Sequence, residues 1–330
     1  MACSKCDNKA IIALQHGNLC KKHFINYFED KVFKTINRFQ LLGRNEKVCV
    51  AASGGKDSLT VLYLTKKYLE KNGLPTDRLF ALAVDEGIKN YREKTLVDLK
   101  KFCHEHSIPL HIVSFREELG KTLDHAYPAI NRNANKKPCN VCGVWRRYLL
   151  NKHARKLGAD KLVTGHNLDD EAQAIVMNIF KANTKLAARL GPVSGIGENK
   201  LFTQRVKPLY LCAEKEVRLY ALLKGFQIQF VECPYSREGY RHQVQEMINE
   251  FENKYKGTKQ GIVNSFLDIL PLLQETNKKD SLPSVVKEIM PSAHTQKAAE
   301  NVRPCGICGE ASNQETCQAC RMKEIIKNEP

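Results

Sequence analysis

The sequence predicts an α/β protein in which helices cover both faces of a parallel sheet. Short apolar runs typical of buried strands alternate with longer segments of helical periodicity through the first half of the chain. A glycine-rich stretch at residues 53–58 lies between the first strand and a helix, and sheets of this kind bind ligands at the carboxyl ends of their strands. The chain has 330 residues, enough for one large core with small accessory modules.

Each predicted element follows from its own stretch of sequence. A small cysteine-containing module comes first, and a helix should follow it at residues 24–42. Apolar runs predict four strands, at 47–52, 79–84, 110–115 and 161–164. Helical patterning covers 56–71, 91–106, 146–157, 169–181, 214–224 and 243–274, with a basic loop at 183–204 and a strand-like run at 228–231.

These elements divide the chain into three predicted parts. Residues 1–24 form an N-terminal zinc module, and residues 25–280 form the catalytic domain, whose helical part we expect to bind RNA. Residues 281–330 contain a linker rich in Lys, Ser and Pro and a C-terminal zinc module. The oligomeric state stays open, with a homodimer as one possibility.

Charge and cysteine content narrow the function classes. Lys and Arg number 52 against 36 acidic residues, a net charge of +16 that favours a polyanionic partner such as nucleic acid over a neutral one. Thirteen cysteines without an export signal are better explained as metal ligands or catalytic thiols than as disulfides. No apolar stretch is long enough to cross a membrane, so we expect a cytoplasmic protein.

Two sets of four residues have the spacing of tetrahedral zinc sites. The first set contains three cysteines and a histidine, and the second contains four cysteines, each built from two Cys-x-x-Cys or Cys-x-x-His pairs. Neither stretch is apolar enough to fold by burial alone, so metal should be required. The ligand sets are Cys3, Cys6, Cys20 and His23, and Cys305, Cys308, Cys317 and Cys320.

The glycine-rich stretch is predicted to bind ATP. Glycines let the backbone approach phosphate oxygens, and the N-terminus of the following helix presents free amides to an anion. Lys56 adds positive charge, and Asp57 can hold Mg²⁺. The alternative is a strand-to-helix turn that needs glycine only for its geometry. The predicted contacts are Ala52, Ser53, Gly54, Gly55, Lys56, Asp57 and Ser58, with backbone groups near Val84 holding adenine.

The stretch Ser-Gly-Gly-Lys-Asp-Ser resembles the signature of the PP-loop ATP pyrophosphatases, which cleave ATP between its α and β phosphates and adenylate their substrates. The run 165–170, Gly-His-Asn-Leu-Asp-Asp, resembles the second nucleotide motif of this family. By that resemblance Gly165 contacts ATP and Asp170 is catalytic, while Asp169 is a Mg²⁺ ligand or a helix cap. Without the resemblance, both acids would be explained as helix caps.

Three further cysteines, Cys139, Cys142 and Cys233, come from two distant segments. Three thiols suit an iron–sulfur cluster with one open iron, or a persulfide on one cysteine that a second resolves. The alternative without a bound group is that Cys139 and Cys142 are ordinary thiols and that Cys233 is a core residue. Cys49, Cys103 and Cys212 are interpreted as packing residues.

The order of these motifs resembles the tRNA 2-thiouridine synthetases, both TtuA-type enzymes and their archaeal and eukaryotic cytosolic counterparts. The motifs are SGGKDS, PCxxCGxxRR, GHNLDDEAQ and ECPY, spread over nearly the whole chain. The resemblance implies a [4Fe-4S] cluster on Cys139, Cys142 and Cys233. It also implies that free sulfide or a thiocarboxylated ubiquitin-like protein supplies the sulfur.

The resulting hypothesis is adenylation of a tRNA uridine at its C2 oxygen, followed by attack of a cluster-bound sulfide at C2. Lys56 would stabilise the phosphates, and Arg146 would position phosphate or RNA. Abundant Asn argues against a thermophile and therefore favours wobble position 34 over position 54. Three hypotheses compete with this one: a 2-thiocytidine synthetase, an amidotransferase-type ligase of the PP-loop enzymes, for which the three cysteines would have no use, and an inactive tRNA-binding zinc scaffold.

Basic residues flanking the site are candidate RNA contacts, and an aromatic among them could stack on a base. Each charge taken alone is more often a solvated surface residue. The candidates are Lys136, Lys137, Arg146, Arg147, Lys152, Arg155, Lys181, Lys185, Arg189, Arg205, Lys207, Arg237, Tyr240, Arg241 and His242.

Overall fold

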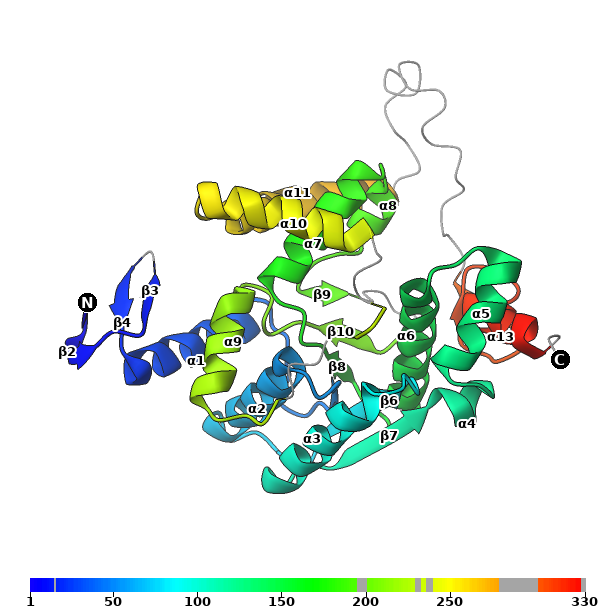
Figure 1. Ribbon diagram of the computed structural model, residues 1–330, viewed down its shortest axis with the longest axis horizontal. Coiled ribbons are helices and arrows are strands. Elements are labelled where there is room, and N and C mark those ends of the chain that lie inside the picture. The colour runs from blue at the N-terminus through cyan, green and yellow to red at the C-terminus, as the bar shows by residue number, and fades with distance from the viewer. Residues whose placement is uncertain (15, 195–200, 229–232, 236–239, 279–301, 328–330) are drawn as a thin grey trace, which may run out of the picture.

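The computed structural model describes residues 1–14, 16–194, 201–228, 233–235, 240–278 and 302–327, and its centre is a six-stranded sheet (Figure 1). The strands run parallel except at one edge, where the last strand is antiparallel to its neighbour. The predicted parallel α/β fold is confirmed. In spatial order the strands are β7 (Leu110–Ser114), β6 (Leu79–Asp85), β5 (Val48–Ala51), β8 (Lys161–Val163), β10 (Gln204–Val206) and β9 (Val193–Ser194).

Helices cover both faces of this sheet because successive strand side chains point to opposite sides. Val48 and Val50 pack with one group of helices, and Cys49 between them packs with the other. The first group is α1 (Lys21–Arg38), α2 (Lys56–Lys71), α3 (Arg92–Glu105) and α9 (Glu214–Leu223). The second group is α4 (Phe115–Leu119), α5 (Leu123–Ala134), α6 (Pro138–Lys156) and α13 (Gln318–Lys327).

A separate helical layer lies over one end of the sheet (Figure 1). Its small core includes Ala172, Ile175, Val263 and Phe266. The single helix predicted over 243–274 is two helices, because the chain turns at Gly257, whose φ of 94° lies in the left-handed region. The layer consists of α7 (Leu168–Phe180), α8 (Thr184–Ala187), α10 (Tyr240–Lys254) and α11 (Thr258–Lys278).

The two cysteine-rich ends lie on opposite sides of the molecule (Figure 1). The N-terminal end contains two short hairpins and continues directly into α1, which begins at Lys21 inside the predicted module. The C-terminal end folds back so that α13 contacts α5 and α6. The short strands are β1 (Ala2–Cys3), β2 (Cys6–Lys9), β3 (Ile12–Leu14), β4 (Gly17–Leu19), β11 (Arg303–Pro304) and β12 (Ala311–Ser312).

Several predicted boundaries were wrong. The helix expected at 146–157 begins at Pro138, where proline suits the first helical turn, so α6 also carries the cysteine pair. Helix α5 and strand β10 were not predicted, and the helix expected to reach residue 42 ends at Arg38. The strand-like run 228–231 and the linker predicted to begin at residue 281 lie almost wholly outside the described residues.

Among the described residues, no helix combines the length and the apolar character that crossing a bilayer would require.

Trp145 should be a main determinant of stability, because it joins α6 to the C-terminal module. Its side chain is fully buried, packs edge-on against Phe115 and donates a hydrogen bond to the Ala319 carbonyl at 3.3 Å. We expect Trp145→Ala to lower the free energy of unfolding by roughly 3–5 kcal/mol in urea denaturation. Val97→Ala, at an exposed position of α3, is the control. A loss for Trp145→Ala no larger than for this control would contradict the packing role.

Candidate active site

The glycine-rich loop is closed by the side chain of Ser58. The Ser58 hydroxyl accepts hydrogen bonds from the amides of Ser53 and Gly54, both at 3.1 Å, and donates to the Gly55 carbonyl at 2.9 Å. Because the hydroxyl proton is used within the loop, Ser58 shapes the loop rather than offering a free donor to a phosphate. Helix α2 begins at Lys56, directly after this loop, so its free N-terminal amides lie at the carboxyl edge of the sheet.

Two glycines permit close approaches around the loop. Gly54 has a φ of 85°, and a Cβ there would lie 2.2 Å from the Thr95 carbonyl oxygen in the first turn of α3. A Cβ on Gly165 would lie 2.9 Å from the carbonyl carbon of Asp57. The two predicted ATP motifs therefore pack backbone to backbone, and a side chain at either glycine would separate them.

Charged groups surround the start of α2. The Lys56 ammonium lies 2.9 Å from Asp57 Oδ2 and 2.8 Å from Glu214 Oε1, and Asn167 donates to Asp57 Oδ1 at 3.0 Å. Burial raises the pKa of the Asp57 carboxyl, and the Lys56 charge opposes that rise. Lys56 is therefore held at the loop by carboxylates from two elements, and its contact with phosphate stays a prediction.

The two acids of the second motif have different environments. Asp170 accepts the Asn167 backbone amide at 3.1 Å as part of a capping box and also pairs with Arg241 of α10 at 2.6 Å. Asp169 is buried, pairs with Lys259 of α11 and accepts the Glu214 amide at 2.7 Å. Asp169 thus links the helical layer to α9, whereas Asp170 stays partly exposed beside the loop.

The remaining predicted ATP contacts lie at the ends of central strands. Ala52 follows β5, and its amide donates to the Leu82 carbonyl at 2.9 Å. The Val84 side chain is buried in the core between the sheet and α6. Val84 therefore offers only backbone groups at this edge, and its contact with adenine stays a prediction.

The three middle cysteines converge near this edge. Cys139 and Cys142 lie one turn apart at the start of α6, and Cys233 packs against the same core cluster as buried Cys142. The exposed Cys139 thiol donates to the Tyr235 carbonyl at 3.1 Å. Burial raises the pKa of Cys142 and of Cys233, while the Arg146 charge lowers both.

A buried carboxylate, Glu86, joins the loop to the thiols, and sequence reasoning missed it. Glu86 lies 3.0 Å from Arg92 Nε and 3.2 Å from Arg146 Nε. Arg92 in turn donates to the Ser53 carbonyl at 2.5 Å, and Arg146 donates to Cys142 Sγ at 3.1 Å. The only sequence signal for Glu86 was its place directly after a strand, at the edge where ligands bind.

The ends of the chain form two closed ligand sets. In each set the four ligand atoms lie within 4.8 Å of one another. Cys6 Sγ and Cys20 Sγ are 3.7 Å apart, and Cys308 Sγ and Cys317 Sγ are 3.8 Å apart. These separations fit the edges of a tetrahedron around one ion with metal–sulfur bonds of about 2.3 Å.

The thiols of Cys139, Cys142 and Cys233 do not form such a set among the described residues. A cluster that takes one thiolate per iron does not need its ligands packed around a single ion. Three converging thiols that are not packed closely enough for one ion therefore fit an iron–sulfur cluster better than a single metal ion. Cys49, Cys103 and Cys212 are buried in the apolar core and belong to neither closed ligand set, which confirms that they are packing residues.

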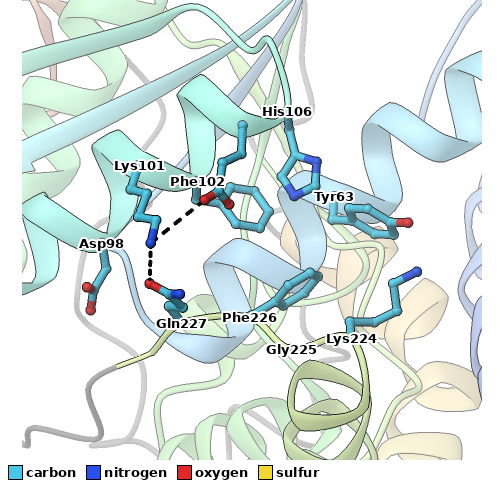
Figure 2. Close-up of a pocket in the computed structure, with 10 residues that line it drawn as sticks. Tyr63, Asp98, Lys101, Phe102, His106, Lys224, Gly225, Phe226 and Gln227 are labelled. Atoms are coloured by element: carbon cyan, nitrogen blue, oxygen red, sulfur yellow. Dashed lines mark hydrogen bonds and ion pairs between the residues drawn. The ribbon is translucent and has the colours of Figure 1, made fainter.

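A cavity of about 280 Å³ lies elsewhere, between α2, α3 and the end of α9 (Figure 2). Tyr63, Phe102 and Phe226 line it. At its edge the Lys101 ammonium donates a hydrogen bond to the Gln227 side-chain oxygen at 2.7 Å. None of the predicted site residues lines this cavity, so it is separate from the candidate active site.

Comparison with known proteins places this geometry in a family. The family model for the PP-loop domain matches residues 25–246. The chain is 35% identical over 329 residues to the tRNA-5-methyluridine(54) 2-sulfurtransferase of Pyrococcus horikoshii, covering 99% of this chain and 95% of that protein. It is 33% identical to the cytoplasmic tRNA 2-thiolation protein 1 of Drosophila ananassae, with 97% and 86% of the two chains covered.

A solved structure shares the fold over nearly the whole chain. This structure is the U34-tRNA thiolase NcsA from Methanococcus maripaludis with its [4Fe-4S] cluster. The TM-score is 0.78 at 33% identity, and the match covers 98% of this chain and 96% of that one.

Removal of the Glu86 charge should destabilise the protein. Arg92 is almost fully buried, so Glu86→Gln would leave a buried cation without its carboxylate, which costs about 3–5 kcal/mol. Urea denaturation should show this loss, whereas Glu117→Gln on the exposed surface should change the free energy of unfolding by less than about 0.5 kcal/mol. Equal stability of the two variants would mean that the bridge contributes nothing.

Proposed function

The chain belongs to the PP-loop family of tRNA thiolation enzymes, and we propose that it makes 2-thiouridine in two steps at one site. ATP first adenylates the C2 oxygen of the uridine, and sulfur then replaces that oxygen. The observation that carries the proposal is the chain of contacts from Ser53 through Arg92, Glu86 and Arg146 to Cys142. A nucleotide loop and a thiol site joined in this way suit consecutive steps on one bound base.

In the first step the uridine C2 oxygen attacks the α-phosphorus, and pyrophosphate leaves. The loop amides and Lys56 are placed to stabilise the negative charge on the phosphates. Asp57 is the proposed Mg²⁺ ligand, since its carboxylate lies at the loop and already faces Lys56. Asp170 is the acid placed to act near the reacting carbonyl, with Arg241 and the capping box fixing its position.

In the second step sulfide attacks C2, the carbon–sulfur bond forms, and AMP leaves with the former C2 oxygen. A [4Fe-4S] cluster bound by Cys139, Cys142 and Cys233 would leave one iron open to hold that sulfide. Arg146 is placed to orient the Cys142 thiolate and to offset its charge. Free sulfide or a ubiquitin-like carrier is the proposed source of the sulfur.

The terminal ligand sets are proposed zinc sites that maintain local structure. All four positions of each set are filled by protein atoms, so neither set has an open position for chemistry. With these sites we propose the division into an N-terminal module at 1–24, a catalytic domain at 25–280 and a linker with a C-terminal module at 281–330. We further propose that the protein acts in the cytoplasm, as a monomer or a homodimer.

The proposed target is the wobble uridine at position 34. The similarity to a U34-tRNA thiolase over 98% of this chain supports it, as does the abundance of Asn. A relative of slightly higher identity acts on position 54, so the position must be measured. Nucleosides mapped by mass spectrometry on tRNA from a deletion strain should lose thiolation at 34, and loss at 54 alone would overturn this assignment.

The function itself is tested by pyrophosphate release in the presence of tRNA. The purified protein, anaerobic and supplied with ATP, sulfide and total tRNA, should release pyrophosphate and form 2-thiouridine. No release with any tRNA pool would instead favour the tRNA-binding zinc scaffold. Formation of 2-thiocytidine in place of 2-thiouridine would identify the other enzyme class.

Gly54→Ala should weaken ATP binding. The new Cβ would lie 2.2 Å from the Thr95 carbonyl oxygen, so the loop must move away from α3. We expect the ATP dissociation constant, measured by calorimetry, to rise at least about tenfold. Gly73→Ala is a matched control, because Gly73 also has a positive φ of 62° but an added Cβ meets no atom within 4 Å. ATP affinity equal to that of the Gly73 variant would contradict the loop assignment.

Cys317→Ser should remove one zinc ion and loosen α6. Cys317 belongs to the C-terminal set, whose module packs on Trp145, the only tryptophan in the chain. Elemental analysis should fall from two zinc equivalents to one, and the Trp145 fluorescence should shift to longer wavelength. Cys103→Ser, at a buried position outside both sets, should keep both ions. Two zinc ions in the Cys317 variant would rule out this ligand set.

A further inference from the structure

Arg147 and Arg205 are two cations near the thiol site. For the described part of the chain, the structure records no ion pair or side-chain hydrogen bond for either guanidinium. Their basic neighbours differ in this respect: Arg146 pairs with Glu86, Lys207 with Glu171 and Arg241 with Asp170. Lys152 and Arg155, also predicted RNA contacts, pair with Glu118 and Glu310.

The backbone brings the two arginines to the same side of the sheet. Arg205 is in register with Leu162 on the parallel neighbour β8, so both side chains point to the same face. Leu162 belongs to the core cluster that contains Trp145 and Leu149 of α6. Arg205 therefore points toward α6, the helix that carries Arg147.

Asn151 fixes how α6 lies against this strand. Its side chain donates to the Leu201 carbonyl at 2.9 Å and accepts the Thr203 amide at 3.0 Å. Arg147 lies one turn before Asn151 on the same helix face, and Arg205 lies two residues beyond Thr203. Strand β10 runs toward the carboxyl edge of the sheet, so Arg205 lies nearer that edge than Thr203 does. Helix α6 runs away from the same edge (Figure 1), so Arg147 lies nearer it than Asn151 does, and the two arginines lie close together.

The electrostatic environment at this place is strongly positive. The pKa of Arg147 is lowered by burial and then by the charges of Arg205 and Arg146. The pKa of the nearby His166 imidazole is also lowered, by removal from water and then by Lys207, Arg241, Arg205 and Arg146. Like charges held close together are unfavourable until an anion joins them. A pair of arginines is best suited to bind an oxyanion such as a phosphate, which can accept two hydrogen bonds from each guanidinium group.

We propose that Arg147 and Arg205 bind a backbone phosphate of the tRNA substrate beside the uridine to be thiolated. This inference rests on the proposed function and names its RNA contact. A Cβ built on Gly143, the residue after Cys142, would lie 3.2 Å from Arg147 Nη1, so the Arg147 guanidinium lies beside the segment that carries the thiol.

The phosphates of ATP fit this place less well. The nucleotide loop follows β5, and Arg205 is on β10, with β8 between them. Two strand spacings separate them by roughly 10 Å across the sheet. A phosphate held by Arg147 and Arg205 is therefore better supplied by the RNA backbone than by the nucleotide bound at the loop.

The test is the salt dependence of tRNA binding, measured by fluorescence anisotropy for the full chain and its variants. We expect Arg147→Gln and Arg205→Gln each to reduce the slope of log affinity against log salt concentration by about 1, since each loses one phosphate contact. Affinity at fixed salt should fall about tenfold. Lys156→Gln is the matched control, because it removes one charge from an exposed position at the far end of α6, and it should keep the wild-type slope.

Lysine variants and measurements of ATP binding serve as further controls. Arg147→Lys and Arg205→Lys should keep most of the slope and lose part of the affinity, because the charge stays but the two-pronged hydrogen bonding is lost. ATP dissociation constants should equal that of the wild type in every variant, with folding verified by thermal melts.

Wild-type slopes in both glutamine variants would overturn the proposal, as would weaker ATP binding with unchanged tRNA binding. In either case, continued thiolation of the same tRNA by the wild-type protein would leave the proposed function intact. If the wild-type protein neither bound nor thiolated tRNA, the proposed function would fail and this inference with it.

Discussion

The buried Glu86 carboxylate is the interaction on which the arrangement of the candidate site depends. One negative charge lies between two guanidinium groups, and each of these reaches a different functional segment. Arg92 holds the Ser53 carbonyl of the nucleotide loop, and Arg146 holds the Cys142 thiol. Buried charges of this kind persist only when they are paired, because the desolvation cost of an isolated one is large. The bridge therefore fixes the loop and the thiols relative to each other.

The C-terminal module extends the same constraint along α6. Trp145 donates to the Ala319 carbonyl, while Arg155 and Asn151 both contact Glu310 at 2.9 and 2.8 Å. The C-terminal module, which contains its own ligand set, therefore holds α6 in place at its middle and its end. Helix α6 is the helix that carries Cys139 and Cys142. This arrangement gives the C-terminal set a structural role that does not require contact with RNA. The N-terminal set lies on the opposite side of the molecule (Figure 1) and, among the described residues, takes no part in the contacts of Trp145, Asn151 and Arg155 given above.

Local sequence signals predicted the features that depend on local chemistry. Apolar runs identified the central strands, and cysteine spacing identified the two closed ligand sets, because both patterns are complete within short segments. Strand β10 was missed since its three residues, Gln204–Val206, include only one apolar side chain and are held by β8 and β9. The Glu86 bridge and the approach of Arg147 to Arg205 depend on tertiary packing, which no local pattern reports. The three-part division of the chain stays a prediction.

The central claim is that loop and thiols serve two consecutive steps at one site. Its most direct measurement is the ratio of pyrophosphate released to 2-thiouridine formed in a single anaerobic turnover with ATP, sulfide and tRNA. The account predicts a ratio near one for the wild-type protein and for Cys103→Ser, and pyrophosphate release without 2-thiouridine for Cys142→Ser. Formation of 2-thiouridine by Cys142→Ser at the wild-type rate would contradict the account, because sulfur transfer would then not need the thiols.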